Sequence, residues 1–119
     1  MISASCHCGE VQIEVSVKPR SLTSCNCSIC RRLGALWAHY TRQEARLVSS
    51  ANSVVAYVWG DKVIEFYRCA LCGCSTHYES VEKSDSSRFS VNARCMSAKG
   101  IEGVPIRNFD GAVSWKFVE

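Results

Sequence analysis

Nine cysteines in a chain of 119 residues constrain this protein more than any other feature of its sequence. Seven of them gather in three clusters, within which one or two residues separate neighbouring cysteines: Cys6 and Cys8; Cys25, Cys27 and Cys30; Cys69 and Cys72. Such spacing lets several thiolates reach the same ion, and tetrahedral sites rich in thiolate are typical of zinc. The sequence therefore predicts a small zinc protein.

The start of the chain bears on the competing chemistry of cysteine, which is disulfide formation. Residues 1–6 show neither the basic segment nor the apolar segment of a secretory signal peptide. We therefore expect a cytoplasmic location, where thiols stay reduced and clustered cysteines bind metals or act in redox chemistry. The sequence contains no redox motif that indicates iron, so zinc is the expected metal.

Composition and charge argue against several other classes of function. The net charge of +3 is mild and, apart from Arg31 and Arg32, the basic residues are scattered, so no nucleic-acid partner is expected. No apolar run approaches the roughly 18 residues that a membrane helix requires. The length predicts one domain spanning residues 1–119, and a homodimer is an open expectation.

Short segments of alternating or β-branched residues predict strands along much of the chain. Residues 11–17 alternate apolar and polar side chains with a period of two, as in a half-buried strand. Residues 54–59 and 63–67 flank Gly60-Asp61, which is a hairpin signal. The predicted fold class is a mainly β, largely antiparallel small domain with at most one or two short helical turns. Further short strands are expected at 36–41, 75–78 and 88–92.

One helical signal covers residues 28–33. Ser28 is expected to be its N-cap, and Gly34 is expected to end it. The tail carries the dipeptide Asp110-Gly111 between apolar segments, and we expect a last turn and strand there. The tail aromatics, Phe109 and Trp115, are assigned to packing, because buried aromatic residues mostly serve cores.

Two of the cysteine clusters are each followed by a glycine, and this feature pairs them. Glycine lets the backbone fold back tightly, so that N–H groups can point at the sulfur atoms. Two such knuckles complete a closed site with four thiolates, which contributes directly to the free energy of folding. The predicted ligands of this structural zinc are Cys6 and Cys8, before Gly9, and Cys69 and Cys72, before Gly73.

The remaining cluster, Cys25, Cys27 and Cys30, offers three thiolates within six residues. Three protein ligands with an open fourth position are the pattern of a catalytic zinc. Arg31 and Arg32 follow directly, and cations of this kind lower the pKa of thiols and hold the carboxylates of substrates. We therefore expect a labile or catalytic zinc here, with the two arginines either binding substrate or acting as plain solvated charges.

The spacing leaves some assignments open. The three-cysteine cluster could share ligands with another cluster, or His7, His39 or His77 could complete it. Cys74 directly follows the second glycine and is either an alternate ligand or a small buried residue. Cys95 stands apart from the other cysteines in the sequence, and a free cysteine usually packs as a small hydrophobic side chain.

These motifs resemble those of the glutathione-dependent formaldehyde-activating (GFA) family, which includes centromere protein V. The resemblance begins with His-Cys-Gly-Glu-Val at residues 7–11 and continues through the cysteine-rich segment 25–34. Residues 66–73 and 90–95 are similar to later motifs of the family, and residues 109–115 fit its C-terminal end. The resemblance spans nearly the whole chain.

The resemblance implies a fold of the β-tent type, which the family shares with methionine-R-sulfoxide reductases. It also implies two zinc ions per chain. By this resemblance the four knuckle cysteines hold the structural zinc, and the three-cysteine cluster holds the labile or catalytic one. The activity implied is that of a carbon–sulfur lyase, in which glutathione and formaldehyde combine to give S-hydroxymethylglutathione.

The resulting hypothesis is a zinc-dependent lyase or synthase that adds a small glutathione-like thiol to an aldehyde, or catalyses the reverse. The metal would deprotonate the thiol. Arg31 or Arg32 would hold the carboxylate of that thiol, and His39 or Tyr40 would supply a proton. Three alternatives stay open: a non-catalytic zinc-binding interaction module, a thiol sensor that gives up its second metal, and a redox enzyme like methionine sulfoxide reductase that uses a cysteine outside the clusters.

Overall fold

The computed structural model describes residues 1–118 and shows a mainly β chain with one short α-helix in that range, which confirms the predicted fold class. The helix is α1 (Ser28–Leu33), and short 3-10 helices lie at η1 (Ala51–Ser53), η2 (Ala93–Cys95) and η3 (Lys99–Ile101). The strands are β1 (Ile2–Ser5), β2 (Gln12–Val15), β3 (Leu22–Cys25), β4 (Trp37–Thr41), β5 (Ala45–Leu47), β6 (Val54–Val58), β7 (Ile64–Cys69), β8 (Ser75–Ser80), β9 (Arg88–Asn92), β10 (Ile106–Asp110) and β11 (Lys116–Phe117). Among these residues, every helix is too short or too polar to cross a membrane.

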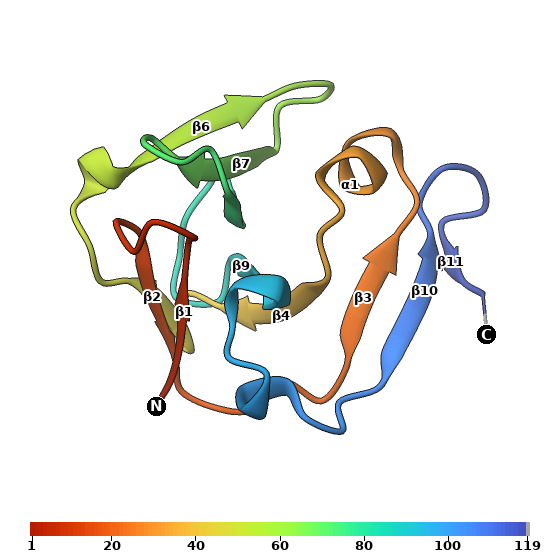
Figure 1. Cartoon of the computed structure of the whole chain (residues 1–119). Helices are drawn as coiled ribbons and strands as arrows, with labels where there is room; N and C mark the ends of the chain where they lie inside the picture. The colour runs from red at the N-terminus through yellow and green to blue at the C-terminus, as the bar shows by residue number, and fades with distance from the viewer. Residues whose placement is uncertain (119) are drawn as a thin grey trace.

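The strands form two sheets (Figure 1). The larger has the order β11-β10-β3-β4-β9-β8-β7-β6, and the smaller has the order β1-β2-β5. Neighbouring strands run antiparallel except β3 and β10, whose parallel pairing brings the tail beside the strand that leads into the three-cysteine cluster. In Figure 1, α1 lies above the end of β3, while β1 and β2 lie on the other side of the molecule.

Several elements agree with the sequence-based predictions. The hairpin expected around Gly60-Asp61 is formed by the antiparallel pairing of β6 and β7. The other strands predicted in the first part of the chain and in its middle correspond to β2, β4, β8 and β9, with small shifts at their ends. The tail forms the expected turn between β10 and β11, which pair with each other.

Three strands were not predicted, and one cap was assigned to the wrong residue. β1, β3 and β5 are only three or four residues long, which is too short for a sequence pattern to identify them, so only their pairing with other strands marks them as strands. The N-cap of α1 is Cys27 instead of Ser28, because the Cys27 sulfur accepts a hydrogen bond from the N–H of Cys30. Gly34 ends the helix in the left-handed conformation, as expected.

Two clusters of buried side chains form the core. The larger one packs the small sheet, including Ile13 and Val15, against residues of the large sheet such as Phe89. The smaller one surrounds Trp37, of which only 1% is exposed, and includes Cys30. Truncating a buried indole of this kind costs about 3–5 kcal/mol. The smaller cluster therefore holds α1, and the cysteines at its start, firmly on the sheet.

Candidate metal centres

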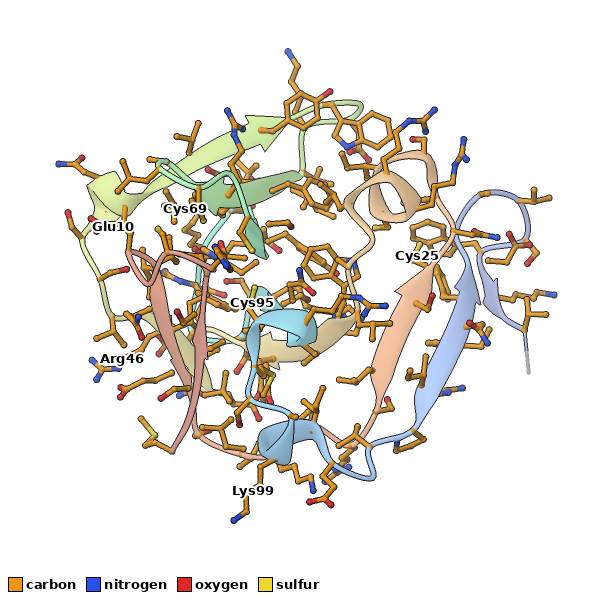
Figure 2. All side chains as sticks on the ribbon, viewed as in Figure 1. Glu10, Cys25, Arg46, Cys69, Cys95 and Lys99 are labelled. Carbon is orange, nitrogen blue, oxygen red and sulfur yellow. The ribbon has the colours of Figure 1, made fainter. Side chains whose placement is uncertain are left out.

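The four cysteines of the two knuckles meet in space, although Cys8 and Cys69 are 61 residues apart in the sequence. Their Sγ atoms all lie within 4.8 Å of one another, and Cys8 Sγ lies 3.6 Å from both Cys6 Sγ and Cys69 Sγ. Cys6 and Cys69 are buried, whereas Cys8 and Cys72 are exposed. Figure 2 shows Cys69 on the side of the molecule where Glu10 and β2 lie. Four thiols at these separations fit the tetrahedral donor set of zinc.

The knuckle glycines have the role that their spacing predicts. Gly9 and Gly73 both have positive φ angles, 85° and 76°, where a side chain would be strained. The turn at Gly9 lets the N–H of Val11 donate to Cys6 Sγ at 3.2 Å. In the second knuckle, hydrogen bonds from backbone N–H groups lower the pKa of Cys72 to about 6. The backbone is thus arranged to offset the charge of thiolate ligands.

The cluster of Cys25, Cys27 and Cys30 forms a second group, in which the Sγ atoms also lie within 4.8 Å of one another. Cys25 ends β3, Cys27 caps α1, and Cys30 lies in the first turn of that helix. Cys30 is buried, and the other two are half-buried. Within residues 1–118 no fourth ligand side chain joins this group. Its donors suit zinc equally well, but they leave a tetrahedral ion one ligand short. Cys25 lies across the molecule from Cys69 (Figure 2).

The electrostatic surroundings differ within the three-cysteine group. Although burial acts to raise it, N–H groups of Cys30 and Ile29 at the start of α1 lower the pKa of Cys27. Burial raises the pKa of Cys25 and of Cys30, even though Trp37 Nε1 donates to Cys30 Sγ at 3.3 Å. Cys27 is therefore the thiol that loses its proton most readily, and a bound metal would displace the protons of the other two.

The loop between Cys25 and Cys27 is held by the C-terminal tail. The N–H of Asn26 donates to the Phe109 carbonyl at 3.3 Å, and its side-chain amide donates to Asp110 at 3.0 Å. In return, the N–H of Ala112 donates to Asn26 Oδ1 at 3.0 Å. The tail thereby contributes directly to the shape of the three-cysteine group.

Gly111 lies against the sulfur of Cys25. A Cβ atom at this position would lie 2.7 Å from Cys25 Sγ and 3.3 Å from Cys27 Cβ, so a side chain has no room there. The sequence signal for this residue was the Asp110-Gly111 dipeptide, which predicted a turn. It carried no indication that the turn would contact candidate metal ligands.

Arg31 and Arg32 occupy the last turn of α1, and both are exposed. Arg32 is tied to its own helix, because its Nη1 donates to the Ser28 carbonyl at 2.8 Å. The ion pairs found within residues 1–118 do not include Arg31. Of the two arginines, Arg31 has the freer guanidinium group.

The structure separates the two side chains considered as proton donors. Tyr40 is buried in the larger core cluster, and its hydroxyl donates to the Val17 carbonyl at 2.8 Å, so it does not serve the three-cysteine group. His39 is exposed, and its Nδ1 lies 2.6 Å from Ser90 Oγ. Burial of part of the ring, together with the charge of Arg88, lowers the pKa of His39, so the ring is neutral at pH 7.

The other two histidines lie outside both cysteine groups. His77 is buried between the rings of Tyr67 and Phe89, with centroids 4.6 Å and 4.8 Å away, and burial lowers its pKa to about 3. It is a neutral packing residue. Within residues 1–118, neither metal group includes His7.

Tyr78 is a candidate site residue that sequence reasoning missed. Its ring packs edge-on against Trp37, with centroids 4.8 Å apart, in the same cluster as Cys30. Its hydroxyl lies 3.5 Å from His39 Nδ1. Burial raises the pKa of Tyr78, which keeps the phenol protonated. The sequence marked this residue only as part of a short strand.

Comparison with known proteins identifies the family of this chain. A crystal structure of a Rhodobacter sphaeroides protein, determined as a structural genomics target, superimposes with a TM-score of 0.71. The two chains are 29% identical, and the match covers 88% of this chain and 99% of the other. The family model described as glutathione-dependent formaldehyde-activating enzyme matches residues 1–103, a span that contains all nine cysteines. The chain therefore belongs to the glutathione-dependent formaldehyde-activating enzyme family.

Proposed function

We propose that this protein is a zinc-dependent carbon–sulfur lyase or synthase that joins a small glutathione-like thiol to a small aldehyde, or separates the two. The observation that carries the proposal is the partly exposed group of three thiols at the start of α1, for which residues 1–118 offer no fourth donor side chain, whereas the other group has four. The proposal treats residues 1–119 as one domain with two zinc ions, a structural one in the four-cysteine group and a catalytic one in the three-cysteine group.

Zinc held by Cys25, Cys27 and Cys30 would keep a position for the substrate thiol and would favour the deprotonated form of that thiol. Hydrogen bonds in the surroundings of the three cysteines favour the negatively charged thiolate form, because backbone N–H groups lower the pKa of Cys27 and Trp37 donates a hydrogen bond to Cys30. In the proposed reaction the substrate sulfur forms a bond to the aldehyde carbon. The carbonyl π electrons move to oxygen, which then takes up a proton.

Arg31 is the proposed anchor for a carboxylate of the thiol substrate. Its exposed side chain extends from the helix that contains Cys30 and is capped by Cys27, and the ion pairs within residues 1–118 do not include it. A guanidinium group binds a carboxylate through two parallel hydrogen bonds. Arg32 has a lesser role in this proposal, because part of its guanidinium group already bonds to Ser28.

Tyr78 is the proposed proton donor for the developing alkoxide. Its raised pKa keeps the hydroxyl protonated, and its ring lies in the cluster that contains Cys30. His39 contacts the Tyr78 hydroxyl from the solvent side and is hydrogen-bonded to Ser90. In this arrangement His39 returns a proton from water to Tyr78 after each turnover.

The test follows S-hydroxymethylglutathione formation by NMR exchange in protein loaded with two zinc ions. We expect the protein to accelerate the reaction of glutathione with formaldehyde above the uncatalysed rate. Tyr78→Phe should lower kcat by about a hundredfold, the usual size of a general-acid contribution. Arg31→Ala should instead raise KM for glutathione by about tenfold, because it removes an interaction made equally in the ground and transition states.

Two controls make the assignment of Arg31 specific. Arg20→Ala removes an exposed arginine from another part of the chain and should leave KM unchanged. Cysteamine, a thiol without a carboxylate, should show the same KM with Arg31→Ala as with the wild-type protein. If protein with two zinc ions accelerates no thiol–aldehyde pair, the lyase proposal fails, and a non-catalytic module or a thiol sensor takes its place.

The redox alternative has less support from the cysteines than the lyase proposal has. A redox enzyme like methionine sulfoxide reductase needs an accessible cysteine with a low pKa outside the metal groups. Burial instead raises the pKa of Cys95 to about 12. The half-exposed three-cysteine group is compatible with a thiol sensor, which would release one zinc to glutathione without turnover.

A further inference from the structure

Two cysteines belong to neither metal group, and they are neighbours in space. Cys74 and Cys95 are 21 residues apart in the sequence, yet their Sγ atoms lie 3.7 Å apart. Both are half-buried. Both thiols donate to the carbonyl of Ser75, at 3.7 Å and 3.3 Å respectively. The nine cysteines thus divide into groups of four, three and two.

We propose that Cys74 and Cys95 are a redox modification site, where a reversible disulfide forms on reaction with a low-molecular-weight disulfide such as glutathione disulfide. The sulfur atoms of a disulfide are about 2.05 Å apart, so the two Sγ atoms must approach by about 1.7 Å. Rotation about the Cα–Cβ bonds of the two cysteines moves their sulfur atoms on this scale. No metal competes for the pair, because the four-cysteine group is complete without it.

The reaction consists of two thiol–disulfide exchanges. In the first, one cysteine loses its proton and attacks glutathione disulfide, which leaves a mixed disulfide and releases one glutathione thiolate that takes up a proton. In the second, the other cysteine displaces the bound glutathione and closes the protein disulfide. Two protein thiols lose two electrons, and glutathione disulfide is reduced to two glutathione thiols, so atoms and electrons balance.

The position of the pair gives the disulfide a consequence for stability. The carbonyl of Cys74 accepts a hydrogen bond from the N–H of Cys69 at 2.9 Å and closes the second knuckle. Cys95 ends η2, and the next residue, Met96, forms a β-bridge with Ala4 in β1. β1 leads to the first knuckle, so the disulfide would link the second knuckle to a segment that pairs with the strand before the first. Figure 2 shows Cys95 on the same side of α1 as Cys69. The disulfide would therefore help to hold this side of the molecule together when zinc is lost.

The first experiment incubates zinc-loaded protein with glutathione disulfide and measures the intact mass and the disulfide map. The wild-type protein should lose the mass of two hydrogen atoms, with the bond located between Cys74 and Cys95. Cys95→Ser should instead retain one glutathione on Cys74. The double variant Cys74→Ser/Cys95→Ser should keep its mass. An unchanged wild-type mass, or a bond that involves a cysteine of either metal group, would overturn the proposal.

The second experiment measures the thermal midpoint after zinc has been removed with a chelator. Oxidised wild-type protein should unfold at a higher temperature than reduced protein, whereas the double variant should show the same midpoint under both conditions. Equal midpoints for oxidised and reduced wild-type protein would contradict the stabilising role. Neither experiment depends on turnover of an aldehyde, so an inactive enzyme leaves both results interpretable, and their failure leaves the lyase proposal untouched.

Discussion

The two metal groups use the same side chain under different constraints. The four-cysteine group draws its ligands from segments 61 residues apart, while the three-cysteine group takes all of its ligands from six consecutive residues. Ligands that are distant in sequence tie separate parts of the chain together, so the metal that they hold contributes to the folding free energy. Ligands within one short segment close almost no loop, and their metal can leave with little loss of structure.

The two groups also differ in what surrounds them. The knuckles are shaped by their own backbone, through glycines with positive φ and N–H groups that donate to sulfur. The three-cysteine group relies on the tail, where residues 109–112 hold the loop around Asn26. These residues lie beyond the segment that the family model matches. The open group is therefore the one whose environment depends on the far end of the chain.

The largest effect is expected from Cys69→Ser, which removes a buried ligand from the four-cysteine group. Structural zinc sites contribute about 10–16 kcal/mol in small peptides. This contribution is as large as the whole free energy of unfolding of a typical domain, about 5–15 kcal/mol. We therefore expect the midpoint of the unfolding transition in circular dichroism to fall steeply, by about 4 °C for each kcal/mol lost. A transition at the wild-type temperature would show that this group is not structural.

Cys27→Ser is the matched change in the three-cysteine group. The unfolding transition should stay cooperative and within a few degrees of the wild type, while zinc content falls from about two ions per chain to one. Mutating a residue that merely hydrogen-bonds to a metal ligand lowers metal affinity or activity by about 10–100-fold. Loss of a ligand itself should therefore lower lyase activity by at least about a hundredfold. Retention of both zinc ions in this variant would contradict the division into a closed and an open group.

Gly111→Ala tests the dependence of the open group on the tail. Its added Cβ would lie 2.7 Å from Cys25 Sγ, so the ligand must shift. We expect zinc affinity at the three-cysteine group to fall by about tenfold, or about 1.4 kcal/mol, in competition with a chelator. Val113→Ala is the control, because Val113 lies in the same turn with 87% of its surface exposed. Equal zinc affinities in the two variants would show that the tail does not shape the three-cysteine group.

The smallest effect concerns acid sensitivity that arises outside both metal groups. The pKa of His77 is about 3 in the folded protein and 6.5 ordinarily, so between these values the unfolded chain binds more protons. Stability should therefore fall as the pH drops from 6.5 toward 3. His77→Phe, which keeps a ring between Tyr67 and Phe89, should reduce this slope by up to about 1.4 kcal/mol per pH unit.

Urea unfolding of zinc-saturated protein between pH 6.5 and 5.5 measures the slope for both chains. Identical slopes would mean that His77 does not carry the acid sensitivity. In that case protonation of the thiolate ligands would account for the acid sensitivity, and the two metal groups would have to be compared for their loss of zinc in acid.

Prediction from the sequence succeeded where a pattern of a few residues is sufficient. The trailing glycines paired the two knuckles, whose four sulfur atoms lie together in the structure, and the Gly60-Asp61 dipeptide marked a hairpin that the structure contains. The N-cap was wrong by one residue, because Ser28 is the usual capping residue but the Cys27 sulfur takes that place. Short strands such as β3 were missed, since their pairing partners lie far away in the sequence.

Several features of the candidate site could not be predicted, because they depend on contacts between distant segments. In the sequence Tyr78 is one residue of a short strand, whereas its packing against Trp37 brings it into the cluster that contains Cys30. The partnership of Cys74 and Cys95 has no signal in the sequence, where 21 residues separate them. Each contact follows from how the strands and their neighbours pack, and a pattern over a few residues carries no information about that packing.

The sequence by itself determined the mainly β class and the glycine turns of the two knuckles, and it indicated a division of seven cysteines into a group of four and a group of three. Those properties follow from ligand spacing and local backbone freedom. Only the tertiary structure decided that Gly111 lies against Cys25, that Tyr78 and Cys30 share one cluster, and that the two remaining thiols are neighbours. The physical reason is that such contacts are set by strand pairing and packing over long separations, such as the parallel register of β3 with β10.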